Sequence, residues 1–161
     1  MGFGMRLAFV LTALALVWTH AAPAQSVDQE ISTRIEMVDS AADTSVRIDR
    51  AAHLAEYIAS RRPLDVANVQ ASVVDHMARL LDDDIDLVRF YAAASLGFFG
   101  ASARRAIPAL ERALARREAE GGIVFGQPQV FTSAVSSVQA ICAALSKIDL
   151  SRVPGACQAY R

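Results

Sequence analysis

The sequence predicts an all-α protein, and three observations support this fold class. From Val27 onward, apolar residues recur at intervals of three and four, which is the spacing of one face of a helix. Clusters of turn-forming residues interrupt this pattern and divide the chain into segments of helical length. Apart from a short apolar stretch at 123–125, no segment alternates over enough residues to predict a strand.

The interruptions define the predicted helices. They lie at residues 42–44, 61–63, 82–86, 99–101 and 121–128. The helices expected between them cover residues 27–41, 44–60, 64–81, 86–98, 103–119 and 131–149. The second helix is expected to end before Pro63, because a residue that precedes proline is disfavoured in the α region.

Local signals predict how two of these helices begin. Asp86 is expected to cap the helix that starts at Leu87, with Ile85 and Phe90 as a hydrophobic staple. Ser102 is expected to cap the helix that follows. Glycines at 100, 121 and 122 suit the positive φ angles of helix C-terminal caps.

The N-terminal segment has the order of a secretory signal peptide. A short n-region ends at Arg6, an apolar stretch runs from Leu7 to about Val17, and Ala22 and Ala24 stand at the −3 and −1 positions of a cleavage site. The alternative, a membrane anchor, requires about 20 apolar residues. We therefore expect a signal peptide at 1–24 with cleavage near Ala24, and a periplasmic or secreted protein.

The remaining chain, 25–161, has the length of a single domain, with a C-terminal tail at 150–161. It is rich in small and branched apolar residues, so it can build a core. It contains 15 basic and 17 acidic side chains, without the basic excess that is typical of nucleic-acid-binding domains. We expect no nucleic-acid partner and no membrane span after cleavage of the signal.

Two cysteines, Cys142 and Cys157, lie close together in the sequence. An even number of cysteines in an exported protein predicts a disulfide, and two buried thiols are the alternative. A turn at Pro154 and Gly155 can fold the tail back onto the last helix. The pair lacks the Cys-x-x-Cys spacing of redox enzymes, so the predicted bond is structural.

Three of the predicted helices resemble one another. With Val46, Val88 and Ser137 aligned, a leucine follows eight residues later and a large apolar residue follows eleven residues later in each copy. These positions are Leu54, Leu96 and Leu145, and then Tyr57, Phe99 and Ile148. The copies are 42 and 49 residues apart, near the period of repeats built from helix pairs. Alanines between these positions allow neighbouring helices to approach closely.

The central copy resembles a known family of repeats. Residues 86–97 read Asp-Leu-Val-Arg-Phe-Tyr-Ala-Ala-Ala-Ser-Leu-Gly, which resembles the second helix of a HEAT repeat. Residues 106–110, with Pro108 and the later Leu114, resemble the first helix of the next unit. The third copy lacks the aspartate and the valine–arginine pair. The resemblance covers residues 64–118 best.

The resemblance implies a short α-solenoid of about three HEAT-like antiparallel helix pairs, whose inner surface usually binds other proteins. Arg47 and Arg89 occupy the same position in the first two copies and are candidate binding residues. A bundle of six helices unrelated to HEAT repeats is the alternative fold.

The connection at 121–131 is a second candidate for binding. It contains glycines and a proline, and it is longer than an ordinary inter-helix turn. Its large apolar residues are Ile123, Val124, Phe125, Val130 and Phe131. Long loops on rigid scaffolds commonly carry function, and exposed aromatic side chains often anchor interfaces. Alternatively, these side chains cover an open end of the core.

Charged residues gather in two other places. Asp82, Asp84 and Asp86 alternate as calcium ligands do, but Leu87 and Ala93 stand where a calcium loop needs glycine and glutamate, so we expect no metal. The helix at 103–119 carries many charges, which suit either an acidic partner or a solvated face with intrahelical ion pairs. These are Arg104, Arg105, Arg112, Arg116 and Arg117, interleaved with Glu111, Glu118 and Glu120.

No catalytic constellation is evident. The histidines after the signal segment, His53 and His76, lack metal-ligand spacing, and no serine or cysteine stands in a known catalytic motif. We expect a binding protein without a cofactor, not an enzyme. The leading hypothesis is a periplasmic or secreted protein–protein interaction module, in a sharper form an immunity-type inhibitor of an exported toxin or hydrolase. The alternatives are a small-ligand-binding or chromophore-handling protein and a structural accessory of the envelope.

Overall fold

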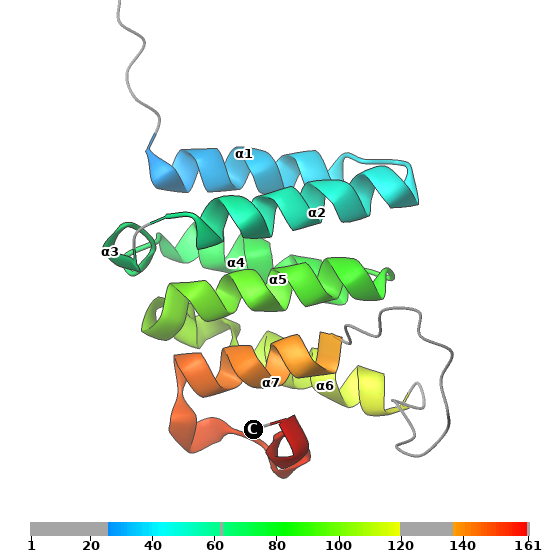
Figure 1. Cartoon of the computed structure of the whole chain (residues 1–161), viewed down its shortest axis with the longest axis vertical. Coiled ribbons are helices and arrows are strands. Elements are labelled where there is room, and N and C mark those ends of the chain that lie inside the picture. Colours follow the sequence, from blue (N-terminus) through cyan, green and yellow to red (C-terminus); the bar gives the residue numbers. More distant parts are fainter. Residues whose placement is uncertain (1–25, 62, 120–136, 161) are drawn as a thin grey trace, which may run out of the picture.

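The computed structural model describes residues 26–61, 63–119 and 137–160 of the chain (Figure 1). Every regular element in these ranges is helical, which confirms the all-α prediction. The α-helices are α1 (Val27–Asp39), α2 (Thr44–Ala59), α3 (Pro63–Val66), α4 (Ala71–Arg79), α5 (Asp86–Phe99), α6 (Ile107–Ala119) and α7 (Ser137–Ile148). The 3₁₀ helices are η1 (Leu80–Asp82), η2 (Gly100–Ala106), η3 (Leu150–Arg152) and η4 (Gly155–Tyr160).

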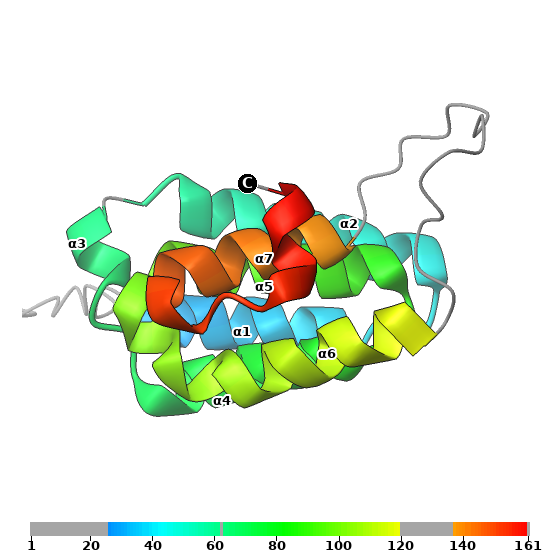
Figure 2. The same ribbon diagram turned by 90° about the horizontal axis from the view of Figure 1, so that it is seen from below.

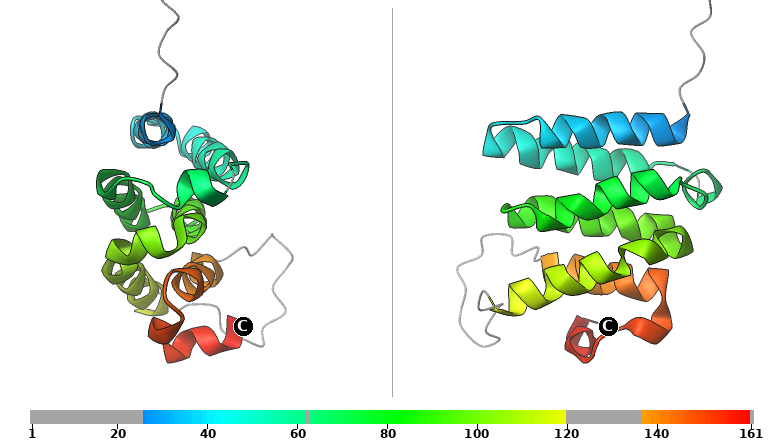
Figure 3. Two further views of the ribbon diagram at one scale, coloured as in Figure 1. Left: turned by 90° about the vertical axis from the view of Figure 1, so that its left-hand side faces the viewer. Right: turned by 180° about the vertical axis from the view of Figure 1, so that it is seen from behind.

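The longer helices form two layers, as the left-hand view of Figure 3 shows. Helices α2, α5 and α7 lie side by side in one layer, and α1, α4 and α6 form the other. Helix α5 is central, since it packs against α2, α7 and α4. Seen from below, η3 and η4 lie next to α7 at the end of the stack (Figure 2).

The apolar positions shared by the three aligned helices lie in the core. Leu54, Leu96 and Leu145 are all buried, and so are Phe99 and Ile148. Tyr57, the corresponding residue of α2, is partly buried and packs against the same core. Burial of these side chains stabilises the fold, because each removes a large apolar surface from water.

Small residues determine how closely α5 and α7 approach. A Cβ atom placed on Gly97 would lie 3.3 Å from Cα of Ala144, so even a methyl group would force the helices to shift. Ala93 on α5 and Ala140 on α7 are also buried. The alanine-rich composition of the two helices therefore has the mechanical role that the sequence suggested.

The prediction of a single helix over residues 64–81 is wrong. The structure divides it into α3 and α4, and residues 67–70 are not helical. Tertiary partners take the backbone groups of this segment: the Ser102 hydroxyl donates to the carbonyl of Ala67, and the amide of Gln70 donates to Oδ1 of Asp28 at 3.4 Å. Asn68 and the β-branched residues near it, Val66 and Val69, also have weak helix propensity, which favours the break between α3 and α4.

Both predicted capping residues have other roles. Ser102 does not cap a helix, since residues 100–106 form 3₁₀ turns and α6 begins only at Ile107. Pro108 explains this start, because proline is tolerated only in the first turn of a helix. Helix α5 begins at Asp86 itself, with Ile85 as its N-cap residue and no side-chain cap.

Candidate functional site

An apolar groove lies between α5 and α7. It encloses about 290 Å³. Its lining residues are mostly small or aromatic: Phe90, Ala94, Gly97, Phe98, Gln139, Ala140, Ala143, Ala144 and Lys147. Gly97 and the alanines form the floor of the groove, and the larger rings of Phe90 and Phe98 line it as well. The arrangement can receive an apolar side chain of a partner.

The outward face of α5 continues this groove as a stripe without charge. Residues at helical spacing share one face. On α5 the partly or fully exposed members of this face are Leu87, Phe90, Tyr91, Ala94 and Phe98. Phe98 is 43% exposed, which is unusual for so large an apolar side chain. A surface helix ordinarily presents polar residues there, so the stripe marks a surface suited to contact with another molecule.

Aromatic and cationic contacts order the groove. The rings of Phe90 and Tyr91 meet edge to face with centroids 5.2 Å apart. Nζ of Lys147 lies 5.1 Å from the centroid of the Phe98 ring. Lys147 is the only lysine of the chain, and within the described residues it forms no salt bridge. The groove thus combines an apolar floor with one positive charge at its edge.

The candidate arginines of the repeat, Arg47 and Arg89, make matching contacts. Nε and Nη2 of Arg47 donate to the carbonyl of Ala41 at 3.2 and 3.1 Å. Nη1 of Arg89 donates to the carbonyl of Asp83 at 2.8 Å. In each case the guanidinium reaches a carbonyl six residues earlier and closes the turn before its own helix.

These arginines belong to a polar ladder that joins the starts of α2, α5 and α7. Nη1 of Arg47 lies 3.4 Å from carboxylate oxygens of both Asp83 and Asp84. The carboxylate of Asp86 accepts from Nη2 of Arg89 at 2.9 Å and from the hydroxyl of Ser137. The carboxylate of Asp86, which was predicted to cap the start of α5, therefore links α5 to α7.

Burial limits what the ladder can offer to a partner. The side chain of Arg89 is 5% exposed and that of Arg47 is 25% exposed, and neither residue lines the groove. Desolvation by burial raises the pKa of Asp83, although the amide of Ile85 and the charge of Arg47 act in the opposite direction. The structure thus places the guanidinium of Arg89 against the turn before α5, and that of Arg47 between the turns before α2 and α5.

The other predicted binding residues, Ile123, Val124, Phe125 and Phe131, lie outside the described residues. The groove itself was not identified from the sequence, where Phe90 was assigned the role of a hydrophobic staple. The sequence nevertheless contained a signal that could have indicated the groove. Helix α5 is apolar around most of its circumference, and such a helix either is fully enclosed or presents an apolar face.

A larger hollow lies elsewhere, beside α1 and α2. It encloses about 520 Å³ and is lined largely by polar and charged side chains. Several of these are already engaged: Nη1 of Arg50 donates to the carbonyl of Met37 at 2.6 Å, and the guanidinium of Arg34 lies 4.1 Å from the centroid of the Tyr57 ring. The smaller groove is the better candidate because small residues form its floor and the 43% exposed ring of Phe98 stands at its edge.

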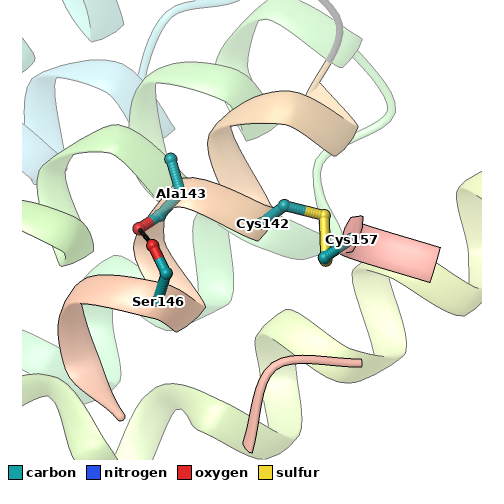
Figure 4. The surroundings of a disulfide bond; sticks show 4 residues. All are labelled: Cys142, Ala143, Ser146 and Cys157. Atoms are coloured by element: carbon teal, nitrogen blue, oxygen red, sulfur yellow. Dashed lines mark hydrogen bonds between the residues drawn. A yellow bond between two sulfur atoms is a disulfide. The ribbon is translucent and has the colours of Figure 1, made fainter. Parts of the chain in front are cut away.

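The predicted disulfide between Cys142 and Cys157 is confirmed (Figure 4). Their Cα atoms are 5.3 Å apart, and both residues are buried. The bond connects α7 to η4 at the end of the stack. In the same helix, the hydroxyl of Ser146 donates to the carbonyl of Ala143 at 2.8 Å, so Figure 4 also shows how this polar side chain is satisfied.

Within residues 26–61, 63–119 and 137–160, His, Cys, Asp and Glu side chains nowhere gather in groups of three that could hold a metal ion. The carboxylates of the acidic run instead meet arginines, as Asp82 does with Nη2 of Arg116 at 2.9 Å. In the same ranges, no helix combines the length and apolar character needed to cross a membrane.

Comparison of the chain with protein-family models, with curated proteins and with solved structures gives no match. Its functional interpretation therefore rests on the groove between α5 and α7 and on the chemistry of the residues around it.

Proposed function

We propose that the protein is a protein–protein interaction module that receives a partner in the groove between α5 and α7. The charge-free stripe on α5, which ends at the 43% exposed Phe98, carries this proposal. Interfaces are typically built on a few aromatic anchors inside a polar rim. The volume of about 290 Å³ is at the lower limit for small-molecule pockets, so an inserted side chain fits better than a free ligand.

The fold that we propose is a short α-solenoid of HEAT-like helix pairs. Its support is the placement of the three aligned helices in one layer, together with the matching contacts of Arg47 and Arg89. In a solenoid of this kind the α2, α5 and α7 layer would form the inner surface. The groove would then lie on the surface that such repeats ordinarily use for binding.

We further propose that residues 1–24 direct export and that the protein works in the periplasm or outside the cell. The Cys142–Cys157 bond supports this compartment, because structural disulfides persist where the environment is oxidising. In the sharper form of the proposal, the partner is an exported toxin or hydrolase that the protein inhibits. The lack of a recognisable catalytic motif is the reason for preferring an inhibitor to an enzyme.

The test is affinity capture from the protein's own extracytoplasmic fraction, with two substitutions compared. Phe98→Ser removes the exposed ring of the groove, and Leu150→Ser is the control because Leu150 is 74% exposed on η3. We expect one stoichiometric partner with the wild type and the control. We expect its loss with Phe98→Ser at an unchanged melting temperature, since hot-spot aromatics contribute about 2 kcal/mol or more.

Either of two outcomes would count against the proposal: equal capture by all three proteins, or recovery of the wild type without any partner. If a partner is captured, its enzymatic or toxic activity is measured with and without the protein. Inhibition by the wild type and not by Phe98→Ser is the result expected of an immunity-type inhibitor.

A further inference from the structure

A third hollow lies on the opposite layer, between α4 and α6. It encloses about 220 Å³. Small residues form its floor and charged residues surround it: Asp75, Ala78, Arg79, Asp82, Arg105, Pro108, Ala109 and Arg112. It shares no lining residue with the apolar groove, so it can act independently of the proposed function.

The charges around this hollow do not balance. Nε of Arg105 lies 2.6 Å from Oδ1 of Asp75, and Nη2 of Arg116 lies 2.9 Å from Oδ1 of Asp82. Both aspartates are therefore already paired. Arg79 and Arg112 are exposed and form no ion pair among the described residues. Two guanidinium groups from different helices are thus left uncompensated around one concavity.

A contribution to the stability of the fold explains only one of these two arginines. Arg79 stands in the last turn of α4, where the helix dipole stabilises a positive charge. Arg112 lies in the interior of α6, and the dipole provides no such reason there. Arginine is the side chain best suited to carboxylates, since its planar fork donates two parallel hydrogen bonds.

We propose that this hollow is a docking site for an acidic protein segment, whose carboxylates pair with Arg79 and Arg112. The alanine floor leaves space for the stem of a glutamate or aspartate side chain, and the two arginines approach from α4 and α6. Nucleic acid is the less suitable occupant, because the whole chain carries a net charge of −1 and lacks the basic excess that binding to a phosphate backbone requires.

The probe for this site is a fluorescein-labelled peptide of alternating glutamate and alanine, and its binding to the full chain is followed by fluorescence anisotropy. The test variant is Arg79→Ala/Arg112→Ala. The control is Arg104→Ala/Arg152→Ala, which removes the same charge from exposed positions outside both the hollow and the apolar groove. We expect the Kd to rise about tenfold in the test variant and less than about twofold in the control, because charge-assisted hydrogen bonds are lost only in the former.

Further measurements separate the site from general electrostatic attraction. Arg79→Lys/Arg112→Lys keeps both charges but loses the planar forks, so we expect intermediate affinity. A glutamine–alanine peptide should not bind. The proposal is overturned by equal weakening in the test and control variants, by undetectable binding of the acidic peptide, or by tighter binding of inorganic phosphate or single-stranded DNA. None of these results would affect capture through Phe98.

Discussion

At the scale of single residues, Asp86 has the most consequential position. Its carboxylate is the partner of Arg89, which is almost fully buried, and it also holds Ser137 at the start of α7. A buried guanidinium is costly unless it is fully paired. Asp86 therefore compensates the charge of Arg89 and connects α5 to α7 with one side chain.

Asp86→Ala should lower the free energy of unfolding by about 2 kcal/mol or more, because hydrogen bonds to a buried charge are lost. Chemical denaturation measures the change. The matched control is Asp49→Ala, whose carboxylate is 72% exposed and meets only the exposed His53. We expect a change below about 0.5 kcal/mol there. Equal effects of the two substitutions would refute the role of the ladder.

Ser95 presents the opposite case. Its side chain is buried in α5, and its hydroxyl has no hydrogen-bond partner among the residues that the structure describes. Replacement of a buried, unpaired polar group by an apolar group of similar shape removes a desolvation cost. Ser95→Ala should therefore raise the free energy of unfolding by about 1 kcal/mol. A loss of stability on denaturation would mean that the hydroxyl has a partner, such as an internal water molecule.

At the scale of elements, the sequence predicted the longer helices well and the short ones poorly. Helices α2 and α5 lie within one residue of the predicted spans, because Asp43, Pro63 and Gly100 are strong local signals. Gly100 has the positive φ of 54° that its type suggested. The break between α3 and α4 had no such signal. It depends on Ser102 and Asp28, which are distant in sequence and were beyond the reach of local patterns.

The cap of α2 makes a prediction about pH. The hydroxyl of Ser45, followed by the amides of Val46 and Ser45, holds the pKa of Asp43 below its usual value. Because the folded pKa is the lower one, this contribution to stability is present above the unfolded pKa and is lost as pH falls through the folded one. Asp43→Ala should therefore lower the melting temperature at neutral pH, and the difference should shrink below about pH 4. A difference that stays constant with pH would contradict this account of the cap.

The disulfide stabilises the C-terminal turns by restricting the unfolded chain. Its sequence separation of 15 residues corresponds to about 3 kcal/mol in the chain-entropy model. Cys142→Ala/Cys157→Ala should lose about that amount on chemical denaturation. A reductant should destabilise the wild type similarly and leave the double variant unchanged. If the reductant has no effect on the wild type, the bond does not contribute as proposed.

At the scale of the whole molecule, the two ends of the stack are closed by different means. At the α1–α2 end, Tyr57 lies between the guanidinium groups of Arg34 and Arg61, each 4.1 Å from its ring centroid. At the other end, η3 and η4 pack against α7, and the disulfide secures η4. Polar or cross-linked ends of this kind prevent further stacking of helices.

The groove shows why a site is harder to predict than a fold. Periodicity identified the buried face of α5, including Leu96 and Phe99. The groove beside Phe98 depends on the close approach of α5 and α7, which Gly97 and Ala144 allow. No local sequence pattern predicts how closely two helices approach each other. The prediction that Arg47 and Arg89 bind a partner was based on their equivalent positions in the repeat. The contacts that both side chains make in the polar ladder were not evident from the sequence.

The most direct test of the central claim is photo-crosslinking in the protein's own compartment, with a photoreactive phenylalanine analogue at position 98. A matched protein carries the same analogue at position 150, which is also exposed but lies on η3, away from the groove. We expect one discrete crosslinked protein from position 98 and none from position 150. Crosslinks that are absent from position 98, or equally strong from both positions, would contradict the claim that the groove between α5 and α7 holds a protein partner.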